Sequence, residues 1–154
     1  MRKVLTMIAC VVTIELAGLA VGLLTRGGTE LYAQTIVKPP LSPPGVVFPV
    51  AWTILYALMG IGLAIVILTP SEARGTAIAL FAIQFVLNLA WSFIFFGTGN
   101  YAVALVKLVA MLAVVVFMVI TFHKVEPLAA WIQVPYLAWL CFATYLNAGV
   151  LALN

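Results

Sequence analysis

The sequence has 154 residues, of which 66% are apolar and only 7% are charged. An ordinary globular protein is about half apolar and about a quarter charged. Seven Lys/Arg and four Asp/Glu side chains are too few to keep a surface of this size in water. This composition argues against a water-soluble enzyme and a disordered tail. It also argues against a nucleic-acid-binding protein, because the net charge of +3 reflects scarce acids and not a basic run. We therefore expect an integral membrane protein.

Five apolar runs are long enough to cross a hydrocarbon core of about 30 Å as helices. They cover residues 4–25, 47–68, 77–96, 101–122 and 128–153. Helices are expected because isolated strands at membrane depth leave backbone groups unpaired, and because the alternation of barrel strands is absent. The predicted fold is all-α, a single domain over residues 1–154 that forms an integral membrane bundle of five transmembrane helices.

The connection over residues 26–46 is the only long one between predicted helices. A long loop in a compact domain is usually functional or disordered. Pro39, Pro40, Pro43 and Pro44 stiffen this loop toward polyproline geometry, which favours an ordered lid over a flexible tether.

Five spans place the two termini on opposite sides of the membrane. The basic residues on the N-terminal side are Arg2, Lys3, Arg74 and Lys124, and those on the other side are Arg26 and Lys38. The positive-inside rule therefore favours a cytoplasmic N-terminus.

Three of the predicted helices carry side chains that recur every four residues and so share one face. Polar groups at membrane depth are energetically costly, which makes such faces candidate functional positions. The three stripes are Phe48, Trp52 and Tyr56; Gln84, Asn88 and Ser92, with Trp91 at their edge; and Pro135, Trp139, Ala143 and Asn147. The simplest arrangement turns the three stripes inward, toward one another.

Two interpretations of these stripes remain open. In the first, the amides and hydroxyls only hydrogen-bond between helices and hold the bundle together. In the second, they belong to a mostly aromatic cavity below a proline-rich lid, which suits a flat hydrophobic small molecule. Tyr32 is counted among the candidate ligand-binding residues, although Trp and Tyr also gather at bilayer interfaces for unrelated reasons.

Glu15 is a charge inside the first apolar run. A carboxyl group in lipid is neutral, paired, or part of a proton or cation pathway. This residue motivates an alternative function, a small proton-coupled exporter of lipophilic cations, although such exporters usually have four spans. No nucleophile–base pair, phosphate-binding loop or set of metal ligands is recognisable, so neither a metal site nor a conventional catalytic site is predicted.

Three groups of segments resemble the signatures of the translocator protein family, also called tryptophan-rich sensory proteins or peripheral-type benzodiazepine receptors. They are residues 38–49 (KPPLSPPGVVFP) with 51–56 (AWTILY); Gln84 with 87–88 (LN) and 91–96 (WSFIFF); and 135–139 (PYLAW) with 142–143 (FA) and 146–147 (LN). The similarity covers essentially the whole chain and points to the bacterial branch. Leu41 and Val46 stand where many members carry Trp, and no basic residue follows Tyr145 to complete the C-terminal sterol-recognition pattern.

The resemblance implies a five-helix bundle, often a homodimer, in the bacterial cell membrane. Such proteins bind protoporphyrin IX, sterols and benzodiazepine-type compounds below the loop between the first two helices. They act in tetrapyrrole sensing, transport or light- and oxygen-dependent degradation, three roles that remain open here. Protoporphyrin IX would be a ligand or substrate, with no tightly bound cofactor.

Carried over by motif, the lining residues are Pro44, Phe48, Trp52, Tyr56, Gln84, Asn88, Trp91, Ser92, Trp139, Ala143 and Asn147. Trp52 and Trp139 are the candidates for porphyrin photochemistry.

Overall fold

The computed structural model describes all residues, 1–154, and contains helices without strands. The elements are α1 (Arg2–Leu24), α2 (Arg26–Thr35), α3 (Val47–Leu68), α4 (Arg74–Ser92), the π-helix η1 (Phe93–Gly97), α5 (Tyr101–Val125), α6 (Pro127–Trp131) and α7 (Val134–Leu153). Five helical segments are long and apolar enough to cross a membrane, namely α1, α3, α4 with η1, α5, and α6 with α7. The predicted all-α bundle with five transmembrane helices is confirmed.

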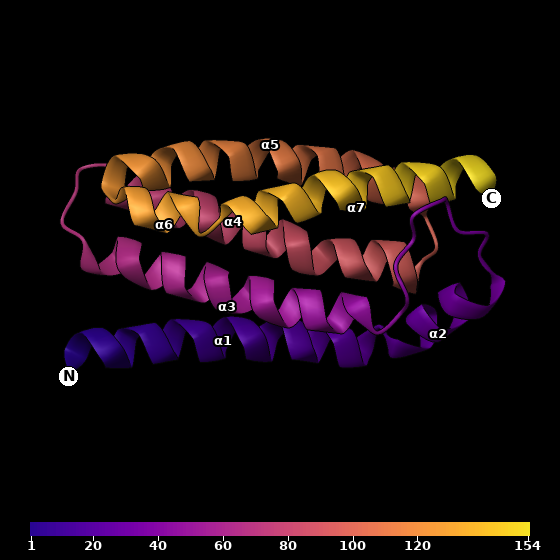
Figure 1. Ribbon diagram of the computed structural model, residues 1–154, viewed down its shortest axis with the longest axis horizontal. Coiled ribbons are helices and arrows are strands. Elements are labelled where there is room, and N and C mark those ends of the chain that lie inside the picture. The colour runs from indigo at the N-terminus through magenta and orange to yellow at the C-terminus, as the bar shows by residue number, and fades with distance from the viewer.

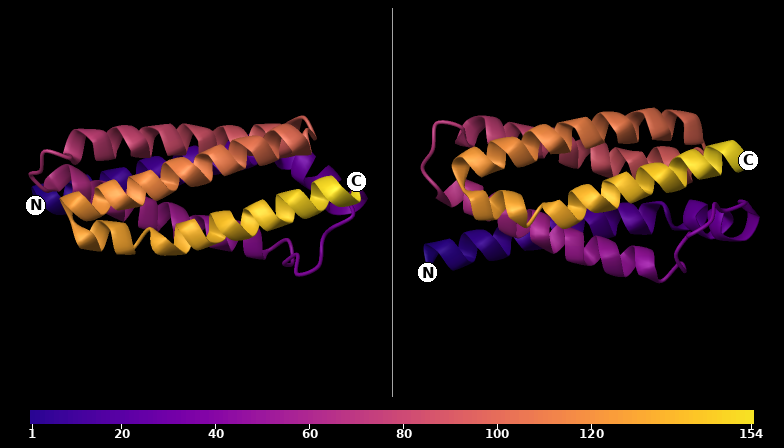
Figure 2. Two further views of the ribbon diagram at one scale, coloured as in Figure 1. Left: turned by 90° about the horizontal axis from the view of Figure 1, so that it is seen from above. Right: turned by 45° about the horizontal axis from the view of Figure 1, so that its top comes forward.

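The long helices lie side by side along one axis, with the two termini at opposite ends of the bundle (Figure 1). Helix α1 packs along α3, α4 packs along α5, and α5 also packs against α6 and α7. The backbones of α3 and α7, in contrast, hardly approach each other, so side chains fill the space between them. Helix α2, the loop that follows it and the C-terminal end of α7 lie together at one end, which we call the lid end (Figures 1 and 2).

The core is built mainly from α3, α5 and α7, whereas α1 has one fully buried side chain, that of Ile14. The outward face of α1 is apolar, as expected for a surface in contact with lipid. Two glycines let α1 approach α3 closely. The Tyr56 ring occupies the space that a side chain at Gly18 would need, and Gly60 of α3 lies against the backbone of Val11.

Two of the predicted spans are not uniform α-helices. The run over residues 128–153 is divided between α6 and α7, because Pro135 near the start of α7 has no N–H to continue the helical ladder of α6. The break is held by short backbone bonds, from Gln133 N to Ala130 O at 3.0 Å and from Leu137 N to Gln133 O at 3.0 Å. The third span ends in η1, a π-helical turn that brings Phe95 into the interior.

The connection over residues 26–46 differs from the expected proline-stiffened lid, since its first half is the helix α2. Only residues 36–46, which we call the lid strap, are non-helical. The strap is tied to the end of α7. The Val37 N–H donates to Asn154 Oδ1 at 3.0 Å, Asn154 Nδ2 donates to Val37 O at 2.9 Å, and the Tyr145 hydroxyl donates to Pro40 O at 2.8 Å. That this segment is an ordered lid stays a prediction, which these hydrogen bonds support.

Candidate ligand-binding site

Four polar side chains from three helices form a hydrogen-bonded network in the middle of the bundle. The Tyr56 hydroxyl of α3 donates to Asn88 Oδ1 of α4 at 2.8 Å, and Asn88 Nδ2 donates to the Tyr136 hydroxyl of α7 at 3.1 Å. The Tyr136 hydroxyl in turn donates to Gln84 Oε1 of α4 at 2.8 Å. All four side chains are buried, and Gln84 and Tyr136 are each 0% exposed. We call these four residues the central network.

One donor in the central network has no partner. Gln84 Nε2 is buried and makes no hydrogen bond, while Gln84 Oε1 is engaged by Tyr136. An unpaired buried donor costs about 1–3 kcal/mol. The central network therefore has one hydrogen-bond donor that is not used within the protein.

Aromatic rings fill the space between α3 and α7 beside the central network. The Trp52 ring lies 5.2 Å from that of Tyr56, 6.4 Å from that of Tyr136 and 6.4 Å from that of Trp139. Trp139 also meets Phe48, with 6.1 Å between the ring centroids. Tyr56 and Tyr136 are buried, whereas Phe48, Trp52 and Trp139 are partly exposed. The rings therefore form a seam that reaches from the buried network to the outside of the bundle.

A second aromatic cluster lies below α2 at the lid end. The Trp91 ring stacks on Phe95 at 4.8 Å, and Phe95 also contacts Tyr32 at 5.4 Å and Tyr101 at 4.9 Å. Trp91 Nε1 donates to Asn147 Oδ1 at 3.2 Å, and Asn147 Nδ2 donates to the backbone carbonyl of Tyr101 at 2.9 Å. Burial, and to a smaller extent the nearby Tyr101, raises the pKa of the Tyr32 hydroxyl, which keeps it neutral.

The structure therefore distributes the predicted site residues over two groups. Near the central network and the seam lie Phe48, Trp52, Tyr56, Gln84, Asn88 and Trp139; in the lid-end cluster lie Tyr32, Trp91 and Asn147. Ser92 and Ala143 are partly buried, and Pro44 on the lid strap is exposed.

Tyr136 is the main residue of this site that the stripes do not contain, although it is quoted in the third signature. The buried face of α7 consists of Tyr136, Leu140, Leu146, Asn147 and Val150. Pro135, the first member of the predicted stripe, is instead exposed. Positions spaced by four residues advance by about 40° around a helix at each step, so such a stripe does not stay on one face over its whole length. Alternating steps of four and three, read from Asn147 backward, reach Tyr136.

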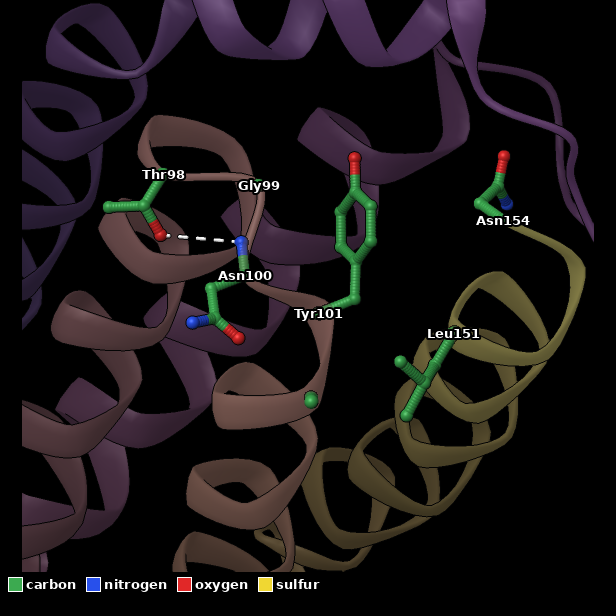
Figure 3. A pocket seen from close by; sticks show the side chains of 7 residues that line it. Thr98, Gly99, Asn100, Tyr101, Leu151 and Asn154 are labelled. Atoms are coloured by element: carbon green, nitrogen blue, oxygen red, sulfur yellow. Dashed lines mark hydrogen bonds between the residues drawn. The ribbon is translucent and has the colours of Figure 1, made fainter.

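Two of the surface hollows are not lined by residues of the seam or of the central network. One, of about 490 Å³, is at the lid end, where Figure 3 shows the 98–100 turn and Tyr101 on one side and Leu151 and Asn154 on the other. The other, of about 200 Å³, lies on α1 and α3 and is lined by Ala9, Cys10, Thr13, Ile14 and Leu63. Neither hollow is lined by a tryptophan. Between α3 and α7, the rings themselves occupy the space.

Charged groups contribute little to the site. The single ion pair joins Arg26 and Glu30 on α2, at 2.9 Å and with both side chains mostly exposed. Glu15 lies on α1, one turn before Gly18, and has no cationic partner. No three His, Cys, Asp or Glu side chains come together as metal ligands. The chemistry of the site rests on aromatic rings, amides and hydroxyls.

Comparison with known proteins places these features in one family. The model of the TspO/MBR family matches residues 9–153. A tryptophan-rich protein TspO from Chlorobaculum tepidum is 37% identical over 155 residues, which cover 99% of this chain and 98% of that protein. A tryptophan-rich sensory protein from Cereibacter sphaeroides is 38% identical over 76% of this chain and 73% of its own length. The translocator protein of Bos taurus is 36% identical over 80% of this chain and 75% of its own length. Together with the five apolar helices, these matches confirm the resemblance: the chain belongs to the TspO/MBR family and is an integral membrane protein.

Proposed function

We propose that this protein binds porphyrins, protoporphyrin IX above all, and other flat hydrophobic molecules such as benzodiazepine-type compounds, at the seam between α3 and α7. The observation that carries the proposal is the placement of Trp52 against Tyr56 and Tyr136 of the central network, with Trp139 next to Trp52. A flat aromatic ligand at this position stacks on indole rings and brings its polar atoms close to the free N–H of Gln84.

The seam is suited to opening. Trp52 and Trp139 meet at 83°, edge to face, and the backbones of α3 and α7 hardly touch there. Rotation of these two side chains therefore admits a planar molecule without separating any closely packed pair of helices. Their partial exposure leaves a route from the hydrocarbon region of the bilayer, where a hydrophobic ligand dissolves.

We further propose that bound porphyrin is degraded in light and oxygen. Dioxygen is the oxidant and is reduced as the porphyrin is oxidised. The indoles of Trp52 and Trp139 are the protein groups that an excited porphyrin, or the singlet oxygen it generates, readily oxidises. This chemistry needs neither a general acid nor a metal ion from the protein. The proposal leaves sensing and transport as roles in which binding is not followed by degradation.

The proposed setting is a homodimer in a bacterial cell membrane with a cytoplasmic N-terminus. The end of the bundle that holds the N-terminus also holds the start of α4 and the end of α5 (Figure 1). By their places in these elements, Arg2, Lys3, Arg74 and Lys124 belong to this end, and Arg26 and Lys38 belong to the lid end. By the positive-inside rule, α2 and the lid strap face away from the cytoplasm.

Titration of the purified protein in nanodiscs with protoporphyrin IX tests the binding proposal. Tryptophan fluorescence is expected to be quenched, and the Trp139→Phe variant is expected to bind more weakly or to degrade the porphyrin more slowly when illuminated in air. Trp131→Phe is the matched control, because Trp131 on α6 is 66% exposed and outside the seam. If the wild-type protein does not bind protoporphyrin IX, the proposal is wrong, and the rings and amides serve only to pack the helices. Unchanged affinity and degradation in both Trp52→Phe and Trp139→Phe would remove the assigned roles.

A further inference from the structure

We propose that Gln133 is a positioning residue for the porphyrin site, because its buried amide fixes the break between α6 and α7 on the backbone of α3. This inference rests on the function proposed above. It concerns a residue that lies outside all three sequence stripes and outside the central network.

The amide of Gln133 has a specific place on α3. The side chain is 0% exposed, and its Nε2 donates to the backbone carbonyl of Leu58 at 3.0 Å. The space for the amide exists because residue 62 is glycine: a Cβ at Gly62 would collide with Gln133 Nε2 and would stand 3.4 Å from the carbonyl oxygen of Ala129. Gly62, Ala129 and Gln133 thus form a close junction of α3, α6 and the break.

Helix packing alone does not account for a glutamine at this junction. Gln133 Oε1 is buried without a hydrogen-bond partner, so the side chain carries an unmatched acceptor into the bundle. Burial of an unpaired polar atom is unfavourable, and an apolar side chain of the same length avoids it. An apolar side chain would not fix the relative position of the two helices as closely. Dispersion contacts tolerate small rotations and translations, whereas a hydrogen bond to one carbonyl does not.

The position of the break determines where the reactive rings lie. Gln133 is the N-cap residue of α7, and Leu137 N donates to Gln133 O at 3.0 Å, so Gln133 is bonded to the first turn of α7, which holds Tyr136. Trp139 follows in the next turn, where it meets Trp52 at 6.4 Å. At its other end α7 is tied to the lid strap through Asn154 and Val37. Helix α7 is therefore held at two points, and the seam lies between them.

The test replaces the amide without changing the length of the side chain. In Gln133→Met, the near-ultraviolet circular dichroism of the ligand-free protein is expected to change, because this signal depends on the relative orientation of neighbouring tryptophans. The rate of light-driven degradation of bound protoporphyrin IX is expected to fall by about tenfold, since reactions that depend on orientation are sensitive to small displacements. The dissociation constant is expected to change by no more than about twofold, because the stacking surface remains.

A second variant reaches the same contact from α3 and keeps the test informative if the first folds poorly. Gly62→Ala displaces the Gln133 amide and is expected to give the same selective loss of degradation rate. The two substitutions together are expected to be no worse than either alone, because they break one contact. The matched controls are Gln34→Met, on the exposed part of α2, and Gly22→Ala, whose added methyl group meets no atom within 4 Å.

The possible outcomes separate this inference from the proposed function. Unchanged circular dichroism and unchanged degradation rate in both Gln133→Met and Gly62→Ala would overturn the positioning role. A parallel loss of affinity, degradation and thermal stability would also overturn it, by showing a general structural role. If the wild-type protein does not bind or degrade protoporphyrin IX, the proposed function fails, and the dichroism of the ligand-free variants still decides whether Gln133 orients the rings.

Discussion

The seam between α3 and α7 and the lid-end cluster contain the same kinds of side chain, but the indole ring is held in place at the lid end and is little constrained at the seam. At the lid end, the indole of Trp91 is stacked on Phe95, and its N–H is bound to Asn147. At the seam, Trp52 and Trp139 touch other rings only edge-on or at a tilt, and neither indole N–H makes a hydrogen bond. Indoles with unused donors between two loosely apposed helices are suited to receive a ligand, whereas a bound and stacked indole is suited to hold helices together.

The largest expected effect concerns the central network, which supports the seam from inside. Tyr136→Phe removes a hydroxyl that serves both Asn88 and Gln84, so two buried groups lose their partner at once. The expected loss of stability is about 2–4 kcal/mol. It is measured as the shift in thermal unfolding in nanodiscs. Tyr145→Phe is the control, because Tyr145 is exposed and its hydroxyl makes one bond, to the lid strap; an equal loss in both variants would contradict the special role of the network.

A pair of tryptophan variants tests the contrast directly. Trp91→Phe is expected to lower stability by about 1–2 kcal/mol, because it breaks the bond to Asn147 and leaves a buried acceptor unpaired. Its affinity for protoporphyrin IX is expected to stay within about twofold of the wild type, which corresponds to about 0.4 kcal/mol. Trp139→Phe is expected to weaken the binding of protoporphyrin IX and to leave the stability nearly unchanged. The thermal unfolding and the fluorescence titration of both proteins, measured side by side, give the answer. If Trp91→Phe weakens binding more than Trp139→Phe does, the assignment of the two regions is wrong.

Two adjacent glycines on α2 test how firmly the lid end is packed. The Cα of Gly28 lies against the backbone carbonyl of Phe96, whereas an added methyl group at Gly27 meets no atom within 4 Å. Gly28→Ala is expected to cost about 1–3 kcal/mol, because backbone has to move. Gly27→Ala is expected to be neutral or slightly stabilising. Hydrogen exchange of α2 amides distinguishes them, with faster exchange expected only in Gly28→Ala; equal exchange rates would show that α2 is loosely held.

The smallest expected effect concerns the lid strap. Asn154→Ala removes both hydrogen bonds to Val37, which are solvent-exposed and so contribute about 1 kcal/mol in total. Because the strap holds the end of α7, its release is expected to loosen the seam, so that bound porphyrin dissociates about fivefold faster with little change in stability. Stopped-flow displacement measures this rate. An unchanged rate would show that ligands leave through the seam without any movement of the strap.

Most of the fold could be predicted from the sequence, because long apolar runs interrupted by turn residues are a local signal. The break before Pro135 also has a local cause, although the run of apolar residues conceals it. Helix α2 was missed because Gly27 and Gly28 are weak helix formers, and it is contacts such as Gly28 on Phe96 that hold the helix. The π-helical turn has no comparable signature in the residues that form it.

The site was predicted less completely than the fold. Gln84 and Asn88 were found because amides inside an apolar run are conspicuous. Tyr136 was missed by the stripe pattern because positions spaced by four residues drift around the helix, and its role depends on partners from another helix. Gln133 was missed for the same reason, since its partner is a backbone carbonyl of α3. Trp91 is held in place by Asn147 and Phe95, whereas Trp52 and Trp139 have no such partners. The spacing of these tryptophans in the sequence does not show this difference.

The contact between Gly18 and the Tyr56 ring has a consequence for biogenesis. The ribosome makes α1 first, yet α1 has a single fully buried side chain and gains its place by packing along α3, with further contacts to α4. Until that docking occurs, Tyr56 and the network behind it face lipid on the α1 side. The candidate site is therefore closed on this side only after α1 has docked, and a protein whose α1 fails to dock would expose Tyr56 there.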